Sequence, residues 1–184
     1  ACEKSYTVFG SGDVIVEIHG TPEGDWPETL PRLGWEMTLP ERMDRACWYG
    51  RGPGECYRDS KQAGRVGRYA MSVDELHTPY VRPQENGNRT DVRWVAMTDL
   101  RGRGLLAVGS PLLDFAAARY TTEDLEAAAH TVDLPRRDFV NWRLDYGHHG
   151  LGSDSCGPPT LEKYFLKPEA FRFRLRLRPF SADA

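Results

Sequence analysis

The segment 171–178 alternates strictly between large apolar residues and arginine, and this alternation constrains the fold more than any other feature of the sequence. Its apolar positions are Phe171, Phe173, Leu175 and Leu177, and its arginine positions are Arg172, Arg174, Arg176 and Arg178. Successive side chains of a β-strand point to opposite faces. The segment is therefore predicted to be a strand that buries one face and presents a ladder of arginines on the other.

The same period-two pattern recurs in other parts of the chain. It covers 13–19 and 32–39, and further strand candidates are 6–9, 46–49, 92–98, 105–109, 115–119 and 139–146. Glycine and proline separate these segments, as in Gly10-Ser-Gly12 and Gly157-Pro-Pro159. Many short strands with turn signals between them predict an all-β fold, an antiparallel β-sandwich, and not a parallel α/β sheet.

One short helix is expected near 121–129. Thr121 supplies a cap, Glu123 and Asp124 are first-turn acids, and good helix formers follow up to Pro135. The weakly periodic stretch 51–88 is predicted to be a long loop that is functional or packs on something. The glycine-rich part of it, 50–55, does not match a phosphate-binding loop and is interpreted as a turn through which a strand leaves the sheet.

Composition limits the class of protein. The 184 residues are enough for one domain, 1–184, and a net charge of −3 gives no electrostatic reason to expect nucleic acid or an anionic membrane as partner. The arginine ladder is accordingly interpreted as an ion-pair face between strands or domains. No CxxC pair is present, so we expect no zinc site and no other metal, and reduced thiols are favoured over two disulfides.

The chain opens on Ala1 and enters a strand within a few residues, which suggests a piece excised from a longer polypeptide, with N-terminal processing as the alternative.

Two segments contain candidate binding residues. The first is 77–89, in which the polar residues His77, Glu85, Asn86 and Arg89 could line a sugar-sized cleft. The alternative, which we favour, is that Glu85 and Arg89 pair with each other or with Arg93 to fasten the loop.

The second segment is 145–158, a glycine-rich stretch that holds the candidates His148, His149, Asp154 and Cys156. Adjacent histidines in an extended chain point to opposite faces, which argues against one shared metal. Cys156 has no activating base nearby in sequence, which argues against a nucleophilic thiol. A loop that reaches over a neighbouring site, with glycines that permit close approach and conformational freedom, is the better interpretation.

A series of motifs then gives the chain a family resemblance. They occur in this order: Leu33-Gly-Trp-Glu-Met37, Trp48-Tyr-Gly-Arg-Gly-Pro-Gly-Glu55, Arg65-Val-Gly-Arg-Tyr69, His77-Thr-Pro-Tyr-Val81, Pro83-Gln-Glu-Asn-Gly-Asn-Arg89, Ala118-Arg-Tyr120 and Leu151-Gly-Ser-Asp-Ser-Cys-Gly-Pro158. Across nearly its whole length the chain resembles the C-terminal small-chain domain of glycoside hydrolase family 2 β-galactosidases. That domain is similar to the supersandwich of galactose mutarotases and is longer, so the chain looks like its C-terminal two-thirds and a partial sandwich.

The resemblance implies a parent enzyme that hydrolyses terminal β-D-galactosyl residues with retention. The family's catalytic carboxylates and its Mg and Na sites lie on a barrel domain, so we expect no catalytic residue and no cofactor here, and a fragment inactive alone. Its partners would be the rest of the β-galactosidase chain and, through it, the galactoside, in the cytoplasm. In the best-known member the position matching Cys156 is a tryptophan on which the aglycone sugar packs, and a thiol cannot replace that stacking. His148 or His149 would then compensate.

Two functional hypotheses remain open. The chain is either an accessory domain that completes the active-site rim of a β-galactosidase, or a free-standing carbohydrate-binding or mutarotase-like module or small subunit, with Glu85 and His77 as its acid–base pair. Strands whose neighbours are missing would expose sheet edges, so a homodimer is also predicted.

Overall fold

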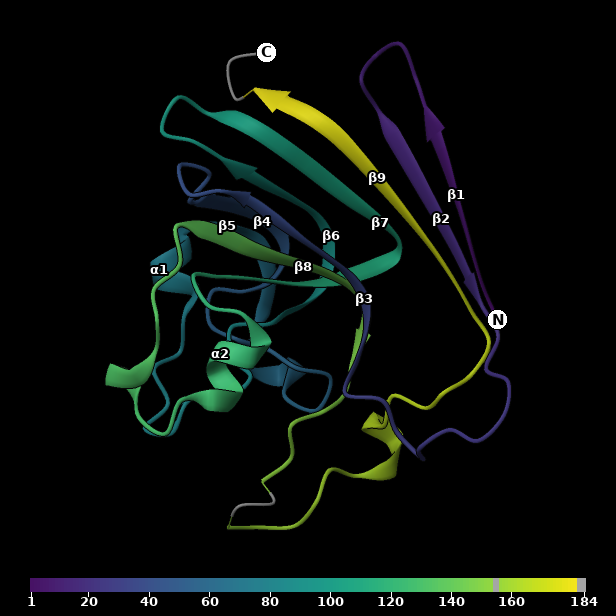
Figure 1. Cartoon of the computed structure of the whole chain (residues 1–184), viewed down its shortest axis with the longest axis vertical. Helices are drawn as coiled ribbons and strands as arrows, with labels where there is room; N and C mark the ends of the chain where they lie inside the picture. Colours follow the sequence, from purple (N-terminus) through teal and green to yellow (C-terminus); the bar gives the residue numbers. More distant parts are fainter. Residues whose placement is uncertain (154–155, 182–184) are drawn as a thin grey trace.

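The chain folds into nine antiparallel strands that form one strongly bent sheet (Figure 1). The computed structural model describes residues 1–153 and 156–181. The strands are β1 (Cys2–Val8), β2 (Val14–Gly20), β3 (Arg32–Pro40), β4 (Arg45–Gly52), β5 (Arg65–Ser72), β6 (Arg89–Thr98), β7 (Arg103–Ala118), β8 (Phe139–His148) and β9 (Phe171–Ser181). The helices are α1 (Val73–Leu76) and α2 (Thr122–Ala127), with 3₁₀ turns at Lys61–Ala63, Thr131–Asp133 and Glu162–Tyr164. The predicted all-β antiparallel class is confirmed.

The long strand β7 connects two layers of the sheet. Along the main path the strand order is β1-β2-β9-β7-β6-β4-β5, while β8 pairs with β7 and β3. The first half of β7, up to Ser110, pairs with β9, and its second half, from Asp114, pairs with β8. In Figure 1, β7 turns at its middle and continues beneath the outer strands. The sequence pattern had predicted two separate strands here, 105–109 and 115–119, which is wrong because the backbone bends without leaving the ladder.

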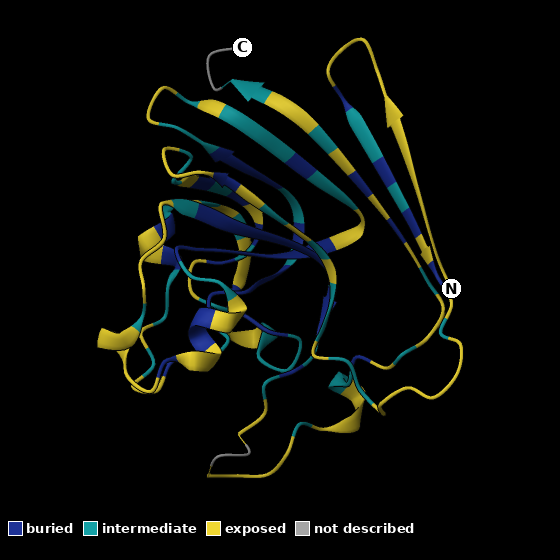
Figure 2. Ribbon diagram, viewed as in Figure 1, coloured by how far each residue is buried: buried dark blue, intermediate teal, exposed yellow. Residues whose placement is uncertain are grey.

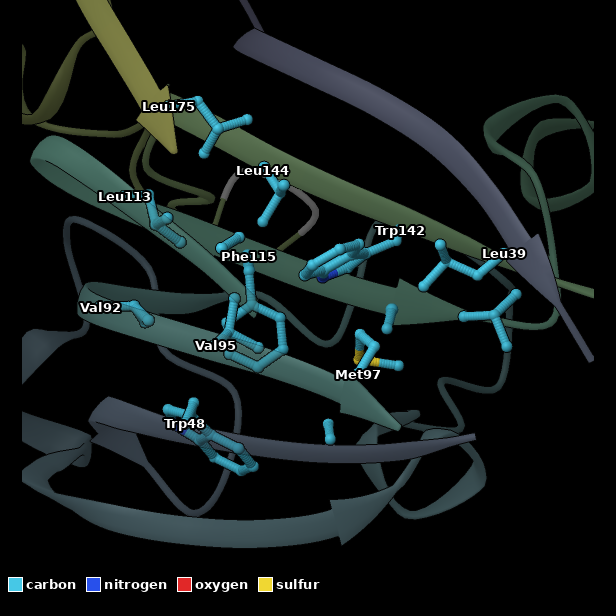
Figure 3. Packing of buried hydrophobic residues seen from close by; sticks show 14 of the residues in the cluster. Leu39, Trp48, Val92, Val95, Met97, Leu113, Phe115, Trp142, Leu144 and Leu175 are labelled. Atoms are coloured by element: carbon cyan, nitrogen blue, oxygen red, sulfur yellow. The ribbon is translucent and has the colours of Figure 1, made fainter. Parts of the chain in front are cut away.

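The hydrophobic core lies between these two layers. Trp142 and Leu144 of β8 face the inward side chains of the outer sheet, among them Phe115, Val95 and Trp48 (Figure 3). All five are fully buried. Because successive residues of a strand alternate faces, the residues of β8 that lie between these apolar ones point to the opposite side. That opposite side carries polar residues.

The arginine ladder of β9 is an ion-pair face, as predicted. Arg172 and Arg174 both approach Glu17 of the neighbouring strand β2, at 3.4 and 3.5 Å, and Arg176 contacts Asp13 at 2.7 Å. Burial alternates residue by residue along β9 (Figure 2). The arginines of these pairs are solvent-exposed, and surface ion pairs contribute little stability, so the apolar face of β9 is what fixes its register.

Two further expectations meet different outcomes. Helix α2 lies inside the predicted range 121–129, and the Thr121 side chain accepts a hydrogen bond from the N–H of Asp124 in a capping box. The stretch 51–88 is not one long loop, because it contains β5 and α1. Among the described strands, β5 is an edge strand that pairs with β4 alone; half of its residues are exposed and none is buried. An edge strand of this kind lacks the apolar alternation on which the prediction relied.

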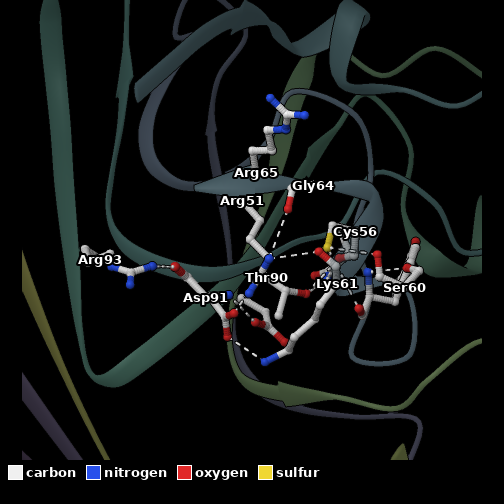
Figure 4. Close-up of polar contacts among 12 residues, drawn as sticks. Arg51, Cys56, Ser60, Lys61, Gly64, Arg65, Thr90, Asp91 and Arg93 are labelled. Atoms are coloured by element: carbon white, nitrogen blue, oxygen red, sulfur yellow. Dashed lines mark hydrogen bonds and ion pairs between the residues drawn. The ribbon is translucent and has the colours of Figure 1, made fainter. Parts of the chain in front are cut away.

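A strained backbone position interrupts the regular pairing of β6 with β7. Asp91 has φ of 56°, in the left-handed region, and lies where the β6–β7 register shifts. Arg51 and Lys61 each contact its carboxylate at 2.6 Å (Figure 4). Two cationic partners lower the pKa of Asp91 against the opposing effect of burial. Ion pairs therefore hold this residue in a conformation that its backbone disfavours.

Within the described residues, no helix is long and apolar enough to cross a membrane. Those residues also contain no group of three or more His, Cys, Asp and Glu side chains that could hold a metal ion. All four cysteines fall in the described part of the chain, and each is free there.

Candidate functional site

A polar cluster lies on the side of β8 that faces away from the core. We call it the Glu85 cluster, and its members are Arg32, Glu85, Arg143 and His148. Arg143 Nη1 donates a hydrogen bond of 2.8 Å to Glu85 Oε2, and Arg32 Nη1 lies 3.9 Å from the same oxygen. His148 Nε2 lies 3.8 Å from the other carboxylate oxygen. Glu85 thus meets two guanidinium groups and an imidazole around one carboxylate.

Burial sets the protonation of the neighbouring groups. Desolvation lowers the pKa of His148, although the Glu85 carboxylate opposes this effect. His148 Nδ1 lies 2.7 Å from the carbonyl oxygen of His149, so Nδ1 carries the proton in the neutral ring and Nε2 faces Glu85. The rings of Tyr57 and His148 pack edge-on, with their centroids 5.1 Å apart. Burial raises the pKa of the Tyr57 hydroxyl, and the negative charge of Glu85 raises it further.

The cluster has hydrogen-bonding capacity that no described residue uses. Three of its buried atoms lack a hydrogen-bond partner, Arg32 Nη1, Glu85 Oε1 and Arg143 Nε, and so does Tyr57 Oη beside the cluster. Beside Glu85 is a cleft of about 310 Å³, lined by Arg82, Pro83, Gln84, Glu85, Thr122, Leu125 and Glu126. Buried polar groups normally find partners, so the unpaired Oε1 of Glu85, a residue that lines the cleft, suits water or a polar ligand. Sugar hydroxyls are ligands of that kind.

Two buried carboxyl groups lie near the cluster and titrate near neutral pH. Asp114 of β7 and Asp145 of β8 are opposite each other in the strand register, and both are more than nine-tenths buried. Desolvation is the main cause that raises the pKa of each to about 7, and the charge of Asp114 further raises that of Asp145. The N–H of Asp91 donates to Asp114 Oδ1 at 3.3 Å, which partly offsets the shift of Asp114.

The segment that follows β8 forms a loop, whose described residues 149–153 and 156–160 we call the rim loop. Asp59 Oδ2 accepts a hydrogen bond of 2.7 Å from the N–H of Gly152, and Thr160 Oγ1 donates to the carbonyl of Gly150 at 3.1 Å. A Cβ at Gly150 would lie 2.8 Å from the Asp59 carboxyl carbon, and Gly152 has a φ of +66°. These two glycines therefore serve close approach, as expected from the sequence, and a left-handed turn.

The candidate residues of this loop have different surroundings. Cys156 is exposed, and its N–H donates to the carbonyl of Ser153 at 3.0 Å. Asp154 lies outside the described residues. His149 Nδ1 accepts a hydrogen bond of 3.1 Å from the N–H of Leu166, and its ring packs on Phe165 at 5.2 Å. His148 and His149 thus contact different parts of the molecule, as expected for adjacent residues of an extended chain.

Three of the four candidates in 77–89 serve the local structure. The Asn86 side chain bridges the N–H of Thr78 and the carbonyl of Gln84. Arg89 is buried, and its guanidinium lies over the Trp48 ring. It donates to the carbonyl oxygens of Leu76, Gly87 and Pro53. His77 packs against the Tyr120 ring, and burial lowers its pKa.

The favoured pairing of Glu85 with Arg89 or Arg93 is wrong. Glu85 turns to Arg143 and Arg32, whereas Arg93 donates to the carbonyl of Asp91 and lies over the Tyr49 ring. The sequence reasoning missed the residues that surround and brace the site, namely Arg32, Tyr57, Asp59 and Arg143. One signal was available for Arg143: in 140–145, polar Asn141, Arg143 and Asp145 alternate with apolar residues, which marks a second, polar face.

The chain is similar in sequence to β-galactosidases. A family model described as the β-galactosidase small chain matches residues 1–177. A curated β-galactosidase of Priestia megaterium is 40% identical over 84% of the chain, one of Arthrobacter sp. (strain B7) is 36% identical over 97%, and one of Kluyveromyces lactis is 37% identical over 95%. The matched stretch makes up 15, 18 and 17% of these relatives, so the chain spans about a sixth of their length.

Proposed function

The chain belongs to the β-galactosidase small-chain family, and from this premise we propose that it is an accessory domain that completes the active-site rim of a β-galactosidase. The rim loop carries the proposal: it leaves β8 directly, Asp59 and Thr160 brace it, and Cys156 is exposed on it. A loop held on a rigid sheet is suited to contact a ligand bound by another domain.

Catalysis itself is assigned to the rest of the β-galactosidase polypeptide. Retaining glycosidases use two carboxyl groups about 5 Å apart on either side of the scissile bond. Among the described residues, the carboxyls with raised pKa are Asp114 and Asp145, which are buried opposite each other on the paired strands β7 and β8, a position that leaves no room for a sugar between them. Their burial supports a non-catalytic role and an isolated chain without hydrolase activity. A cytoplasmic location is part of the same proposal.

Kinetics of the β-galactosidase polypeptide that carries this sequence test the proposal. Asp59→Ala removes the acceptor of the Gly152 N–H, so we expect a several-fold higher KM for lactose, whose aglycone is a sugar, and little change for a nitrophenyl galactoside. Asp59→Asn keeps an oxygen at this position and is the matched control. Cys156→Trp should lower the KM for lactose, because an indole stacks on a sugar ring. Unchanged lactose kinetics in both Asp59→Ala and Cys156→Trp would contradict the role of the rim loop.

A second candidate function is a carbohydrate-binding or mutarotase-like module, and the unpartnered atoms of the Glu85 cluster favour it. A mutarotase needs an acid and a base beside the anomeric oxygen. His148 is better placed than His77 to act as the second member of an acid–base pair, because its Nε2 faces the Glu85 carboxylate. Galactose titration and a mutarotation assay on the 184-residue chain test this function, with Glu85→Gln as the variant. Binding or turnover that Glu85→Gln abolishes would support it, and the absence of both would exclude it.

The predicted homodimer also stays a proposal. Strand β1 pairs only with β2, and all seven of its residues are exposed. Such an edge offers free N–H and C=O groups to another strand. Sedimentation of the chain at several concentrations would detect self-association.

A further inference from the structure

The outer face of the sheet, opposite the core, contains a hollow with an apolar floor. The strand registers place Cys47 of β4 between Ala70 of β5 and Ala96 of β6, and Ala96 opposite Leu106 of β7. Small side chains therefore lie side by side, while the neighbouring positions carry the larger Trp94 and Phe180. The resulting hollow has a volume of about 450 Å³ and is lined by Cys47, Arg68, Trp94, Ala96, Thr98, Leu106, Val108 and Phe180.

A second hollow continues the first across the same face. Its volume is about 430 Å³, and it shares Val108 with the first. Its lining residues are Phe9, Ser11, Asp13, Ile15, Val108, Gly109, Ser110, Arg174 and Arg176. Together they form a groove, which we call the outer groove, from β4 to the hairpin between β1 and β2. In Figure 2 the strands that carry it alternate between buried residues and more exposed ones.

The charged residues at the first hollow are positive. Arg68 lines it, and Arg178 lies opposite Leu106 in the register of β7 and β9. Both arginines are exposed, and neither forms an ion pair with a residue that the structure describes. No aspartate or glutamate is among the eight lining residues. The first hollow thus combines an apolar floor and an aromatic wall with a cationic border.

This combination selects the chemistry of a partner. A second copy of the chain in a two-fold contact would bring the same arginines against one another, and like charges close together disfavour association. A large apolar side chain flanked by carboxylates complements both the floor and the border. Resting on the proposed function, we propose that the first hollow of the outer groove docks an acidic segment with a large apolar side chain from another part of the β-galactosidase polypeptide. The relatives support this source, because more than four-fifths of their length lies outside the matched stretch.

Alkylation of Cys47 by N-ethylmaleimide, followed by peptide mass spectrometry, tests the proposal, because this thiol lines the hollow. In the full β-galactosidase polypeptide we expect alkylation of Cys47 at least tenfold slower than in the 184-residue chain. The double charge reversal Arg68→Glu with Arg178→Glu should restore the rate in the full polypeptide. Arg172→Glu is the matched control, because Arg172 belongs to the same ladder but lies opposite His19 of β2, away from the first hollow, and it should leave the protection unchanged.

Three results would overturn the inference. They are equal alkylation rates in both forms, protection that survives the double reversal, and protection of the 184-residue chain alone that grows with its concentration together with a dimer in sedimentation. The last result would assign the groove to a second copy. None of these readouts depends on aglycone kinetics, so failure of the docking inference and failure of the proposed rim function can be told apart.

Discussion

Replacing Asp114 by asparagine should change how the stability of the chain depends on pH. The pKa of Asp114 is about 7 in the folded chain, against 3.8 for the free side chain, because burial disfavours its charge. The folded state therefore holds this proton more tightly than the unfolded state. Its contribution to stability is fully present below about pH 4 and is lost as the pH rises to about 7.

The magnitude follows from the size of the shift. Each pKa unit corresponds to about 1.4 kcal/mol, so a shift of about three units amounts to roughly 4 kcal/mol between pH 4 and pH 8. Asparagine does not titrate, and its side-chain oxygen can still accept the hydrogen bond from Asp91 N–H. We expect the free energy of unfolding of Asp114→Asn to rise relative to the wild-type chain across this interval by at least 1 kcal/mol.

Urea unfolding at five pH values between 4.5 and 8.5, followed by circular dichroism, measures the difference. Desolvation lowers the pKa of His148, so stability is lost as the pH falls below about 6.5, but this effect is common to both chains and cancels in the comparison. Asp25→Asn, at an exposed position, is the matched control. Parallel profiles for the wild type and Asp114→Asn would refute the reasoning, because they would mean that the buried carboxyl carries no excess proton affinity.

Three further substitutions test the packing around the site by the same unfolding assay. Glu85→Gln leaves the buried guanidinium of Arg143 without its charged partner and should cost about 3 kcal/mol; a cost below 0.5 kcal/mol would show that the pair is not desolvated. Gly34→Ala would place a Cβ about 2.5 Å from the Cα of Asp145, so β3 and β8 must separate and we expect a loss of about 2 kcal/mol or a failure to fold, whereas unchanged stability would contradict this backbone contact. Thr121→Ala removes the cap of α2 and should cost about 1 kcal/mol, with Thr121→Ser, which keeps the hydroxyl, close to the wild type.

Period-two patterns predicted most of the strands because those strands bury one face against the core. Strand β9 is the clearest case, and the observed bounds of β2, β3 and β8 also enclose or closely match the predicted segments. The pattern failed for β5. Tyr69 and Met71 of this edge strand pack against the core, but the arginines and Gly67 interrupt the apolar alternation in the sequence. It failed for β7 because Gly109 and Pro111 signal a break, whereas the ladder continues through a bend.

The site was harder to predict than the fold because its contacts join residues far apart in sequence. The polarity of its own segment identified Glu85 as a candidate. Its partner Arg143 lies 58 positions later in the sequence, and its partner Arg32 lies 53 positions earlier. Local reasoning favoured Arg89 because it is near in sequence. Strand β6 instead directs Arg89 toward backbone carbonyls over Trp48, away from Glu85. The alternation in 140–145 marks Arg143 as a residue of a polar face, but only the sheet topology shows that it, and not Arg89, reaches Glu85.

The end of β8 connects the two candidate sites, and this connection decides which variants can separate them. His148 faces Glu85 through Nε2 and donates from Nδ1 to the carbonyl of His149, while His149 holds Leu166 at the base of the rim loop. A substitution at Glu85 or His148 therefore acts on the cleft and also on the support of the loop. Asp59 contacts the rim loop through Gly152, and its described hydrogen bonds include none to the Glu85 cluster. Aglycone-dependent kinetics of Asp59 variants thus report on the rim, whereas a loss seen with Glu85→Gln alone is evidence about the cleft only if Asp59→Ala leaves the same measurement unchanged.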